Sequence, residues 1–168
     1  MPRSALIVAV PEAEPLVGHW RERYDNASIG IPAHVTVLFP FVPVEETDDA
    51  LLAELRELFA SQSAFSFSLP RVARFPGVAW LAPEPAKPFR RLTELIFSRY
   101  PDYPPYEGIH DELIPHLTVG VGETVLQDEI DAALAPHLPI EAEARKVTLL
   151  VEDGSGRWHA RAEFSLVA

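Results

Sequence analysis

Two four-residue segments of the chain, 34–37 (HVTV) and 116–119 (HLTV), repeat the pattern His-apolar-Thr-apolar. Each segment follows a loop that contains proline and opens a predicted strand. Because strand side chains alternate between two faces, His34 and Thr36 share one face, as do His116 and Thr118. A neutral imidazole accepts a proton, a protonated one donates a proton, and hydroxyls donate hydrogen bonds to phosphate oxygens. Brought together, these four residues predict an acid–base site for a phosphate that needs no metal.

The pair of segments resembles the signature of the 2H phosphoesterase superfamily, especially its 2′-5′ RNA ligase-like and cyclic phosphodiesterase branches. The separation of 82 positions between His34 and His116, the chain length and the order of elements are similar over essentially the whole chain. The resemblance implies a bilobal α+β fold with a pseudo-twofold axis and a central cleft that holds both motifs. It also implies metal-independent cleavage of 2′,3′-cyclic or related phosphodiesters of nucleotides or RNA ends. Thr36 and Thr118 would then bind the phosphate.

Three other interpretations of the repeated histidines stay open at this stage. One is a nucleotide-binding module, for instance for AMP, that has the same fold and turns nothing over. Another is an RNA end-processing enzyme or 2′-5′ RNA ligase, which needs a basic surface around the cleft. The third is a zinc site, for which His110 with Asp111 or Glu112 would supply further ligands. Zinc leaves the threonine of both segments unexplained, so we predict that no metal and no other cofactor takes part.

The charge of the chain limits the size of the substrate. With 14 Lys and Arg against 25 Asp and Glu, the net charge is −11, which argues against binding to long nucleic acid or to an anionic membrane surface. The segment 71–99 is an exception, because six basic residues there stand against two acidic ones. Arg71 and Arg74, on or between predicted strands, are candidate phosphate ligands. We expect a small nucleotide or a short RNA end as the substrate.

The loop before the second motif supplies two further substrate-binding candidates. Tyr106, like Tyr103, can stack against a base, since every base has a π-face. His110 lies six residues before His116 in the same loop. We therefore predict that this loop contributes to the substrate side of the cleft.

Composition excludes several other classes of protein. The chain contains no cysteine, which excludes disulfides, thiolate metal sites and a cysteine nucleophile. No stretch approaches the roughly 18 apolar residues of a membrane-spanning helix. We expect a cytoplasmic monomer.

Hydrophobic periodicity and turn residues predict two mostly antiparallel sheets with flanking helices, in one domain spanning residues 1–168 with one motif in each lobe. Thr47 or Asp48 is the predicted cap of the second helix, and Thr124 with Gln127 forms a predicted capping box at the fourth. The predicted strands are 4–10, 34–41, 65–69, 72–75, 78–81, 116–121, 145–153 and 157–167, and the predicted helices are 12–24, 51–59, 89–100 and 126–134.

Overall fold

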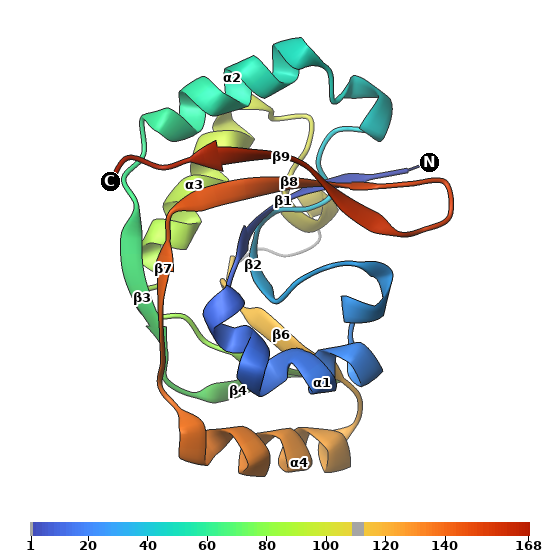
Figure 1. Cartoon of the computed structure of the whole chain (residues 1–168), viewed down its shortest axis with the longest axis vertical. Coiled ribbons are helices and arrows are strands. Elements are labelled where there is room, and N and C mark those ends of the chain that lie inside the picture. The colour runs from blue at the N-terminus through green and yellow to red at the C-terminus, as the bar shows by residue number, and fades with distance from the viewer. Residues whose placement is uncertain (1, 109–112) are drawn as a thin grey trace.

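The computed structural model describes residues 2–108 and 113–168 of the chain. Figure 1 shows the arrangement of their helices and strands. The strands are β1 (Ser4–Ala9), β2 (His34–Leu38), β3 (Phe65–Leu69), β4 (Val72–Phe75), β5 (Val78–Leu81), β6 (Leu117–Val121), β7 (Ile140–Ala144), β8 (Lys146–Glu152) and β9 (Trp158–Ser165). The α-helices are α1 (Glu14–Tyr24), α2 (Asp49–Ala60), α3 (Lys87–Arg99) and α4 (Thr124–Leu134). No helix in the described part of the chain is long and apolar enough to cross a membrane.

The strands pair antiparallel into three sheets, with the orders β2-β1-β8-β9, β4-β5-β6 and β3-β7. In Figure 1 the four-stranded sheet lies in the upper half of the molecule with α2 and α3, here called the upper lobe. The three-stranded sheet lies below with α1 and α4, here called the lower lobe. The ladder of β3 and β7 runs between the lobes. The predicted bilobal α+β fold is confirmed, and this small ladder is an addition to it.

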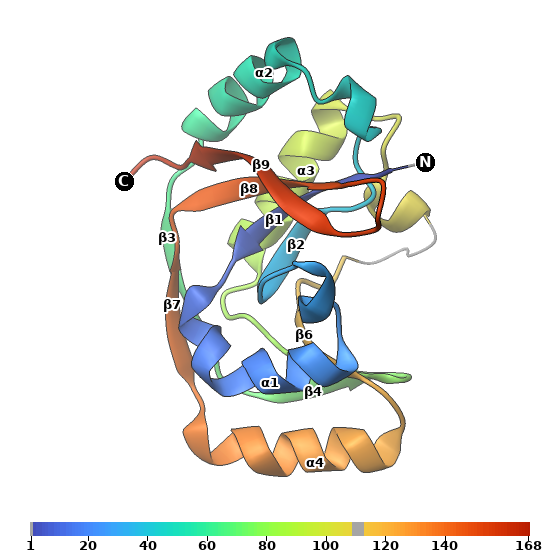
Figure 2. The same ribbon diagram turned by 45° about the vertical axis from the view of Figure 1, so that its right-hand side comes forward.

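Both motifs lie on edge strands that face the middle of the molecule. β2 is an edge of the upper sheet and β6 is an edge of the lower sheet. The two strands lie close together in space, as Figure 2 also shows. The chain therefore brings two segments 82 positions apart to the same place, with one histidine from each lobe.

The apolar residues of the motifs anchor both strands in the main hydrophobic core. Val35, Val37, Leu117 and Val119 are all buried and belong to one continuous cluster. The hydroxyl of Thr93 on α3 donates to the backbone carbonyl of Val37 at 2.6 Å, which also ties β2 to the helix behind it. The predicted alternation of core-facing and site-facing residues is thus confirmed.

Several predicted boundaries hold, and others need correction. Asp48 caps α2 by accepting from the backbone N–H of Leu51 at 2.9 Å, as predicted. The predicted capping box at α4 is wrong, because the cap position is Glu123 and the Gln127 side chain donates instead to the carbonyl of Gly122. The strand predicted over 34–41 ends at Leu38, since Pro40 has no N–H to continue a ladder.

Candidate active site

The two motif histidines are held by the same backbone contact. Nδ1 of His34 lies 2.8 Å from the carbonyl oxygen of Pro32, and Nδ1 of His116 lies 2.7 Å from that of Ile114. A carbonyl oxygen only accepts hydrogen bonds, so each Nδ1 carries the hydrogen. In each neutral ring, Nε2 is therefore the nitrogen that carries the lone pair and can accept a proton. The second motif therefore repeats the first in geometry as well as in sequence.

His34 is held in its neutral form. Protein atoms surround most of the ring, although part of the residue still reaches solvent, and this burial is the main reason that its pKa falls to about 4. The hydrogen bond to Pro32 opposes the shift, whereas the positive charges of Arg21 and of a protonated His116 add to it. At neutral pH Nε2 of His34 therefore carries a lone pair, as a general base requires.

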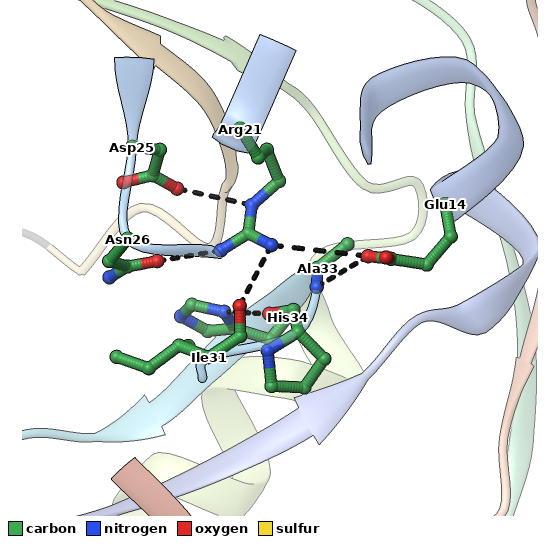
Figure 3. A network of polar contacts seen from close by, with 8 residues as sticks. Glu14, Arg21, Asp25, Asn26, Ile31, Ala33 and His34 are labelled. Atoms are coloured by element: carbon green, nitrogen blue, oxygen red, sulfur yellow. Dashed lines mark hydrogen bonds and ion pairs between the residues drawn. The ribbon is translucent and has the colours of Figure 1, made fainter. Parts of the chain in front are cut away.

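A buried arginine organises the loop that leads to His34 (Figure 3). Only 1% of the Arg21 side chain is exposed. Its guanidinium donates to Asp25 at 3.1 Å, to the Asn26 side-chain oxygen at 2.6 Å and to the carbonyl of Ile31 at 2.9 Å. A buried cation is stable only when its donors are satisfied, and here the acceptors come from the loop itself. Arg21 thus fixes the path of the chain into the first motif.

Glu14 completes this network from the first turn of α1. One carboxylate oxygen lies 3.9 Å from the Arg21 guanidinium and accepts from the backbone N–H of Ala33 at 2.7 Å. Ala33 is the residue immediately before His34. Helix α1 therefore holds both ends of the loop, one through Arg21 and the other through Glu14.

Aromatic rings surround His116. The ring centroids of Phe75 and Trp80 lie 5.2 and 5.8 Å from the His116 centroid, both in edge-on geometry. Tyr106 stacks on the same imidazole at 6.4 Å, with 27° between the planes. Phe75 and Trp80 also stack on each other at 4.5 Å. The second histidine is therefore packed by aromatic side chains.

Tyr106 links the two motifs. Besides stacking on His116, its phenol forms a hydrogen bond with the side chain of Thr36, and burial raises the pKa of that phenol. The backbone N–H of Tyr106 donates to the carbonyl of Phe39 at 2.7 Å. Tyr106 and Glu107 both adopt left-handed backbone conformations, with φ of 50° and 58°, at a cost of about 1–2 kcal/mol each. The fold accepts this strain and places a phenol between the motifs.

Residues 9–156 match the family model described as the 2′-5′ RNA ligase superfamily. The chain belongs to this superfamily.

Relatives in the superfamily include proteins provisionally named phosphoesterases. One from Bacillus licheniformis is 25% identical over 163 residues, which cover 92% of each chain. One from Geobacillus kaustophilus is 28% identical over 108 residues, and that alignment spans 60% of this chain and 58% of the relative. Both similarities support membership of a phosphoesterase-type family.

Solved structures show the same superfamily fold. The crystal structure of Escherichia coli LigT complexed with 3′-AMP superposes with a TM-score of 0.66 at 18% identity and covers 100% of both chains. The crystal structure of TT0787 from Thermus thermophilus gives a TM-score of 0.64 at 22% identity, covering 98% of this chain and 97% of that one. At these identities the likeness concerns the fold.

Arg71 and Arg74, the two arginines predicted to bind phosphate, have different surroundings in the structure. Arg74 forms ion pairs with Asp128 at 2.8 Å and Asp131 at 3.5 Å on α4. Its neighbour Phe75 contacts His116, so strand alternation puts Arg74 on the opposite face of β4. The prediction that Arg74 binds substrate is therefore not supported by its placement. Arg71 is exposed and lies just before β4.

A different arginine of the basic segment lies near the second motif. Arg90 on α3 donates to the carbonyl of Leu113 at 3.3 Å and lines a small hollow together with Thr36, Tyr106 and His116. The sequence did not single out this residue. The basic segment thus contributes one cation beside the motifs, while Arg74 is neutralised on α4.

The other residues that were predicted to contribute to the site are Tyr103, Thr118 and His110. Tyr103 packs edge-on against Phe41 at 5.9 Å. Thr118 lies opposite Trp80 in the β5–β6 register, which puts both on the site face of the lower sheet. His110, with Asp111 and Glu112, lies outside the described residues. Within residues 2–108 and 113–168, no three His, Asp or Glu side chains come together as a metal site.

Proposed function

We propose that the protein is a metal-independent phosphodiesterase that hydrolyses 2′,3′-cyclic or related phosphodiesters of small nucleotides or RNA ends. The supporting observation is the repeated geometry of the two histidines, each held at Nδ1 by a carbonyl and each accompanied by a threonine two residues later. Their strands lie side by side. This arrangement is suited to in-line displacement, with one imidazole on each side of a phosphate.

We give His34 the role of general base, because burial lowers its pKa and favours the neutral imidazole. Nε2 of His34 takes a proton from a water molecule as the water oxygen bonds to phosphorus. The bond from phosphorus to one ribose oxygen breaks, and a protonated His116 gives its Nε2 proton to that oxygen. Thr36 and Thr118 donate to the phosphoryl oxygens and stabilise the charge that develops on them. Loss of a proton from His34 and gain of one by His116 restore the enzyme.

Two observations support a small substrate. The net charge of −11 opposes attraction of a long polyanion. The LigT structures are described as complexes with 3′-AMP, ATP and NADP+, which are small nucleotides bound by that protein. We carry the ligand class, but no particular nucleotide, over to this chain.

The proposal is tested with a panel of 2′,3′-cyclic mononucleotides and 2′-5′-linked dinucleotides, with and without EDTA. The wild type is expected to hydrolyse at least one of them, in the presence of EDTA as well, and His34→Ala and His116→Ala are expected to lose that activity. Loss of wild-type activity in EDTA, with recovery on adding zinc, would establish the metal site instead. Binding of AMP without turnover of any panel member would establish a binding module.

A further inference from the structure

The segment before the second motif has an unusual backbone at Tyr106. Three consecutive residues, Tyr106, Glu107 and Gly108, have positive φ values of 50°, 58° and 76°. Left-handed conformations are uncommon for residues other than glycine, and they persist at functional sites where the surrounding contacts impose them. The contacts of Tyr106 therefore indicate what this part of the chain holds in place.

Two of these contacts fix Tyr106 to the strand segment of the first motif. Its backbone N–H donates to the carbonyl of Phe39 at 2.7 Å, one residue after the end of β2. Its phenol forms a hydrogen bond with the side chain of Thr36, three residues earlier in the same segment. Since the main chain and the side chain are both tied to one segment, the phenol has little freedom to leave Thr36.

The second motif holds the ring of Tyr106. The ring stacks on the imidazole of His116, with 6.4 Å between the centroids and 27° between the planes. Nδ1 of that imidazole is itself fixed by the carbonyl of Ile114 at 2.7 Å. Tyr106 is thus held by its backbone, its hydroxyl and its ring at once.

The Thr36 side chain lies at the wall of two spaces of different size. Together with Tyr106 and His116 it lines a hollow of only about 20 Å³, which has room for about one water molecule. Together with His34 it lines an open cavity of about 210 Å³. A phosphoryl group therefore has room to reach Thr36 on the His34 side and not on the Tyr106 side.

The phenol of Tyr106 keeps its hydrogen at neutral pH. Burial raises its pKa, against the opposing effect of the bond with Thr36. A neutral phenol has one hydrogen to donate, whereas a threonine hydroxyl has one hydrogen and lone pairs that accept, and a phosphoryl oxygen only accepts. With a phosphate bound, all three groups are satisfied when Tyr106 donates to Thr36 and Thr36 donates to the phosphate.

The threonine of the second motif has a different neighbour. Thr118 lies opposite Trp80 in the β5–β6 register, and within residues 2–108 and 113–168 the buried indole nitrogen of Trp80 has no hydrogen-bond partner. Trp80 therefore does not contact the Thr118 hydroxyl in the way that Tyr106 contacts that of Thr36. The two threonines of the motifs differ in their support.

We propose that Tyr106 is a positioning residue, whose phenol donates to Oγ1 of Thr36 and so turns the hydrogen of Thr36 towards a phosphoryl oxygen. This role rests on the proposed function and deepens it, because it names the residue that prepares one of the two phosphate ligands. No proton is transferred at Tyr106, which stays a neutral phenol. The Thr36 hydroxyl is oriented before the substrate binds, and its hydrogen bond strengthens as charge develops on the phosphoryl oxygen.

Tyr106→Phe removes the hydroxyl and keeps the ring that stacks on His116. With the cyclic or 2′-5′-linked nucleotide that the wild type cleaves fastest, this variant should lose about 3- to 10-fold in kcat/KM, mainly in kcat, because the bond matters most in the transition state. Tyr100→Phe is the matched control, since the Tyr100 phenol donates to Glu54 at 2.7 Å, away from the motifs. It should keep the kcat and KM of the wild type. A wild-type kcat in Tyr106→Phe overturns the proposed role.

Double-mutant cycles separate positioning of Thr36 from a general effect on the structure. In a Thr36→Val background there is no hydroxyl to orient, so Tyr106→Phe should change kcat/KM less than about twofold. In a Thr118→Val background Tyr106→Phe should cost the same roughly 3- to 10-fold as in the wild type. Equal losses in both backgrounds overturn the assignment of Tyr106 to Thr36 and leave the proposed function intact.

Substrates with sulfur in place of one phosphoryl oxygen give a second measurement that needs no change at Thr36. Sulfur is a weak hydrogen-bond acceptor, so the diastereomer with sulfur facing Thr36 gains little from an oriented hydroxyl. Tyr106→Phe should slow the other diastereomer about 3- to 10-fold and this one less than about twofold. Equal slowing of both diastereomers overturns the proposed role.

Absence of turnover with every nucleotide of the panel contradicts the proposed function instead. The role of Tyr106 is then tested by calorimetry with orthovanadate, an oxyanion that can adopt the five-coordinate geometry of in-line displacement. Binding about 3- to 10-fold weaker in Tyr106→Phe than in the wild type, with no such loss when Tyr106→Phe is added to Thr36→Val, supports the role. Equal binding by Tyr106→Phe and the wild type, an equal loss in the Thr36→Val background, or no binding by the wild type overturns it.

Discussion

The surroundings of His34 and His116 differ although the two motifs have the same pattern of His and Thr and the same backbone contact. His34 lies beside an open cavity, and a network around the buried cation Arg21 orders the loop that precedes it. His116 is packed by the rings of Phe75 and Trp80. Two motifs of the same pattern therefore have unequal surroundings, because the neighbouring side chains differ in charge and in the space that they leave beside each histidine.

The largest expected effects come from removing one histidine at a time. His34→Asn and His116→Asn should each lower kcat/KM for a cyclic nucleotide about 10²–10⁴-fold. A nucleoside 3′-(p-nitrophenyl phosphate) has a leaving group that departs without a proton. On that substrate His116→Asn should recover most of its activity and His34→Asn should not, in steady-state assays against the wild type. Recovery by His34→Asn alone would exchange the two roles.

Removing the cation on the His34 side tests whether the network matters to one motif only. Arg21→Met leaves Asp25, Asn26 and the Ile31 carbonyl without their donor, which should cost about 3–5 kcal/mol of unfolding free energy. The acid limb of kcat/KM, set by a His34 pKa of about 4, should also move to higher pH because a positive charge is gone.

Arg23→Met on the exposed side of the same helix is the control, and it should change stability by no more than about 0.5 kcal/mol. Urea denaturation measures both variants. A stability loss in Arg21→Met no larger than in Arg23→Met would show that the network is dispensable.

A smaller effect is expected in the pH dependence of stability. Because the folded state lowers the pKa of His34 to about 4, from about 6.5 when unfolded, the unfolded chain binds more protons between these values. Stability must therefore fall as the pH drops from about 6.5 towards 4. His34→Asn should remove about 1–3 kcal/mol of that decline. Thermal unfolding at pH 7 and pH 4.5 measures it, and parallel declines in both proteins would contradict a buried neutral His34.

The smallest expected effects distinguish two arginines of the basic segment. Arg90→Ala removes a cation that lines the hollow beside His116 and should raise KM for a cyclic nucleotide about three- to tenfold, or about 1 kcal/mol. Arg74→Ala removes an exposed ion pair with α4 and should change neither KM nor stability by more than about 1 kcal/mol. A raised KM in Arg74→Ala would place that side chain at the substrate after all.

The two motif strands and the C-terminal hairpin could be predicted from the sequence, because their residue patterns match strand and turn geometry. The alternation in HVTV and HLTV predicted both the buried valines and leucine and the shared face of His and Thr, because strand geometry leaves no other arrangement. The C-terminal hairpin was equally predictable, since Gly154 and Gly156 lie in a short turn between two predicted strands, the first of which is largely apolar. Gly156 indeed has a positive φ of 83°.

Features that depend on tertiary contacts were missed. Arg21 occurs one turn after buried Val17 on α1, and a charged residue on that apolar face was a signal that could have revealed it. β7 has the sequence IEAEA, and its Glu and Ala residues disfavour strands in isolation. The packing of Phe75 and Trp80 against His116 joins segments about 40 residues apart, and no local pattern specifies such a contact.

The place of β8 in the upper sheet has a consequence for biosynthesis. β8 lies between β1 and β9, and its pairing joins Ser4 to Val151 and Leu6 to Leu149. β1 in turn pairs with β2, which carries His34. On a ribosome, the first motif emerges early, but the sheet that supports it stays open until β8 and β9 have emerged. We therefore expect the proposed catalytic residue His34 to lack this support until then, and removal of the β8–β9 hairpin to disable it from more than a hundred positions away.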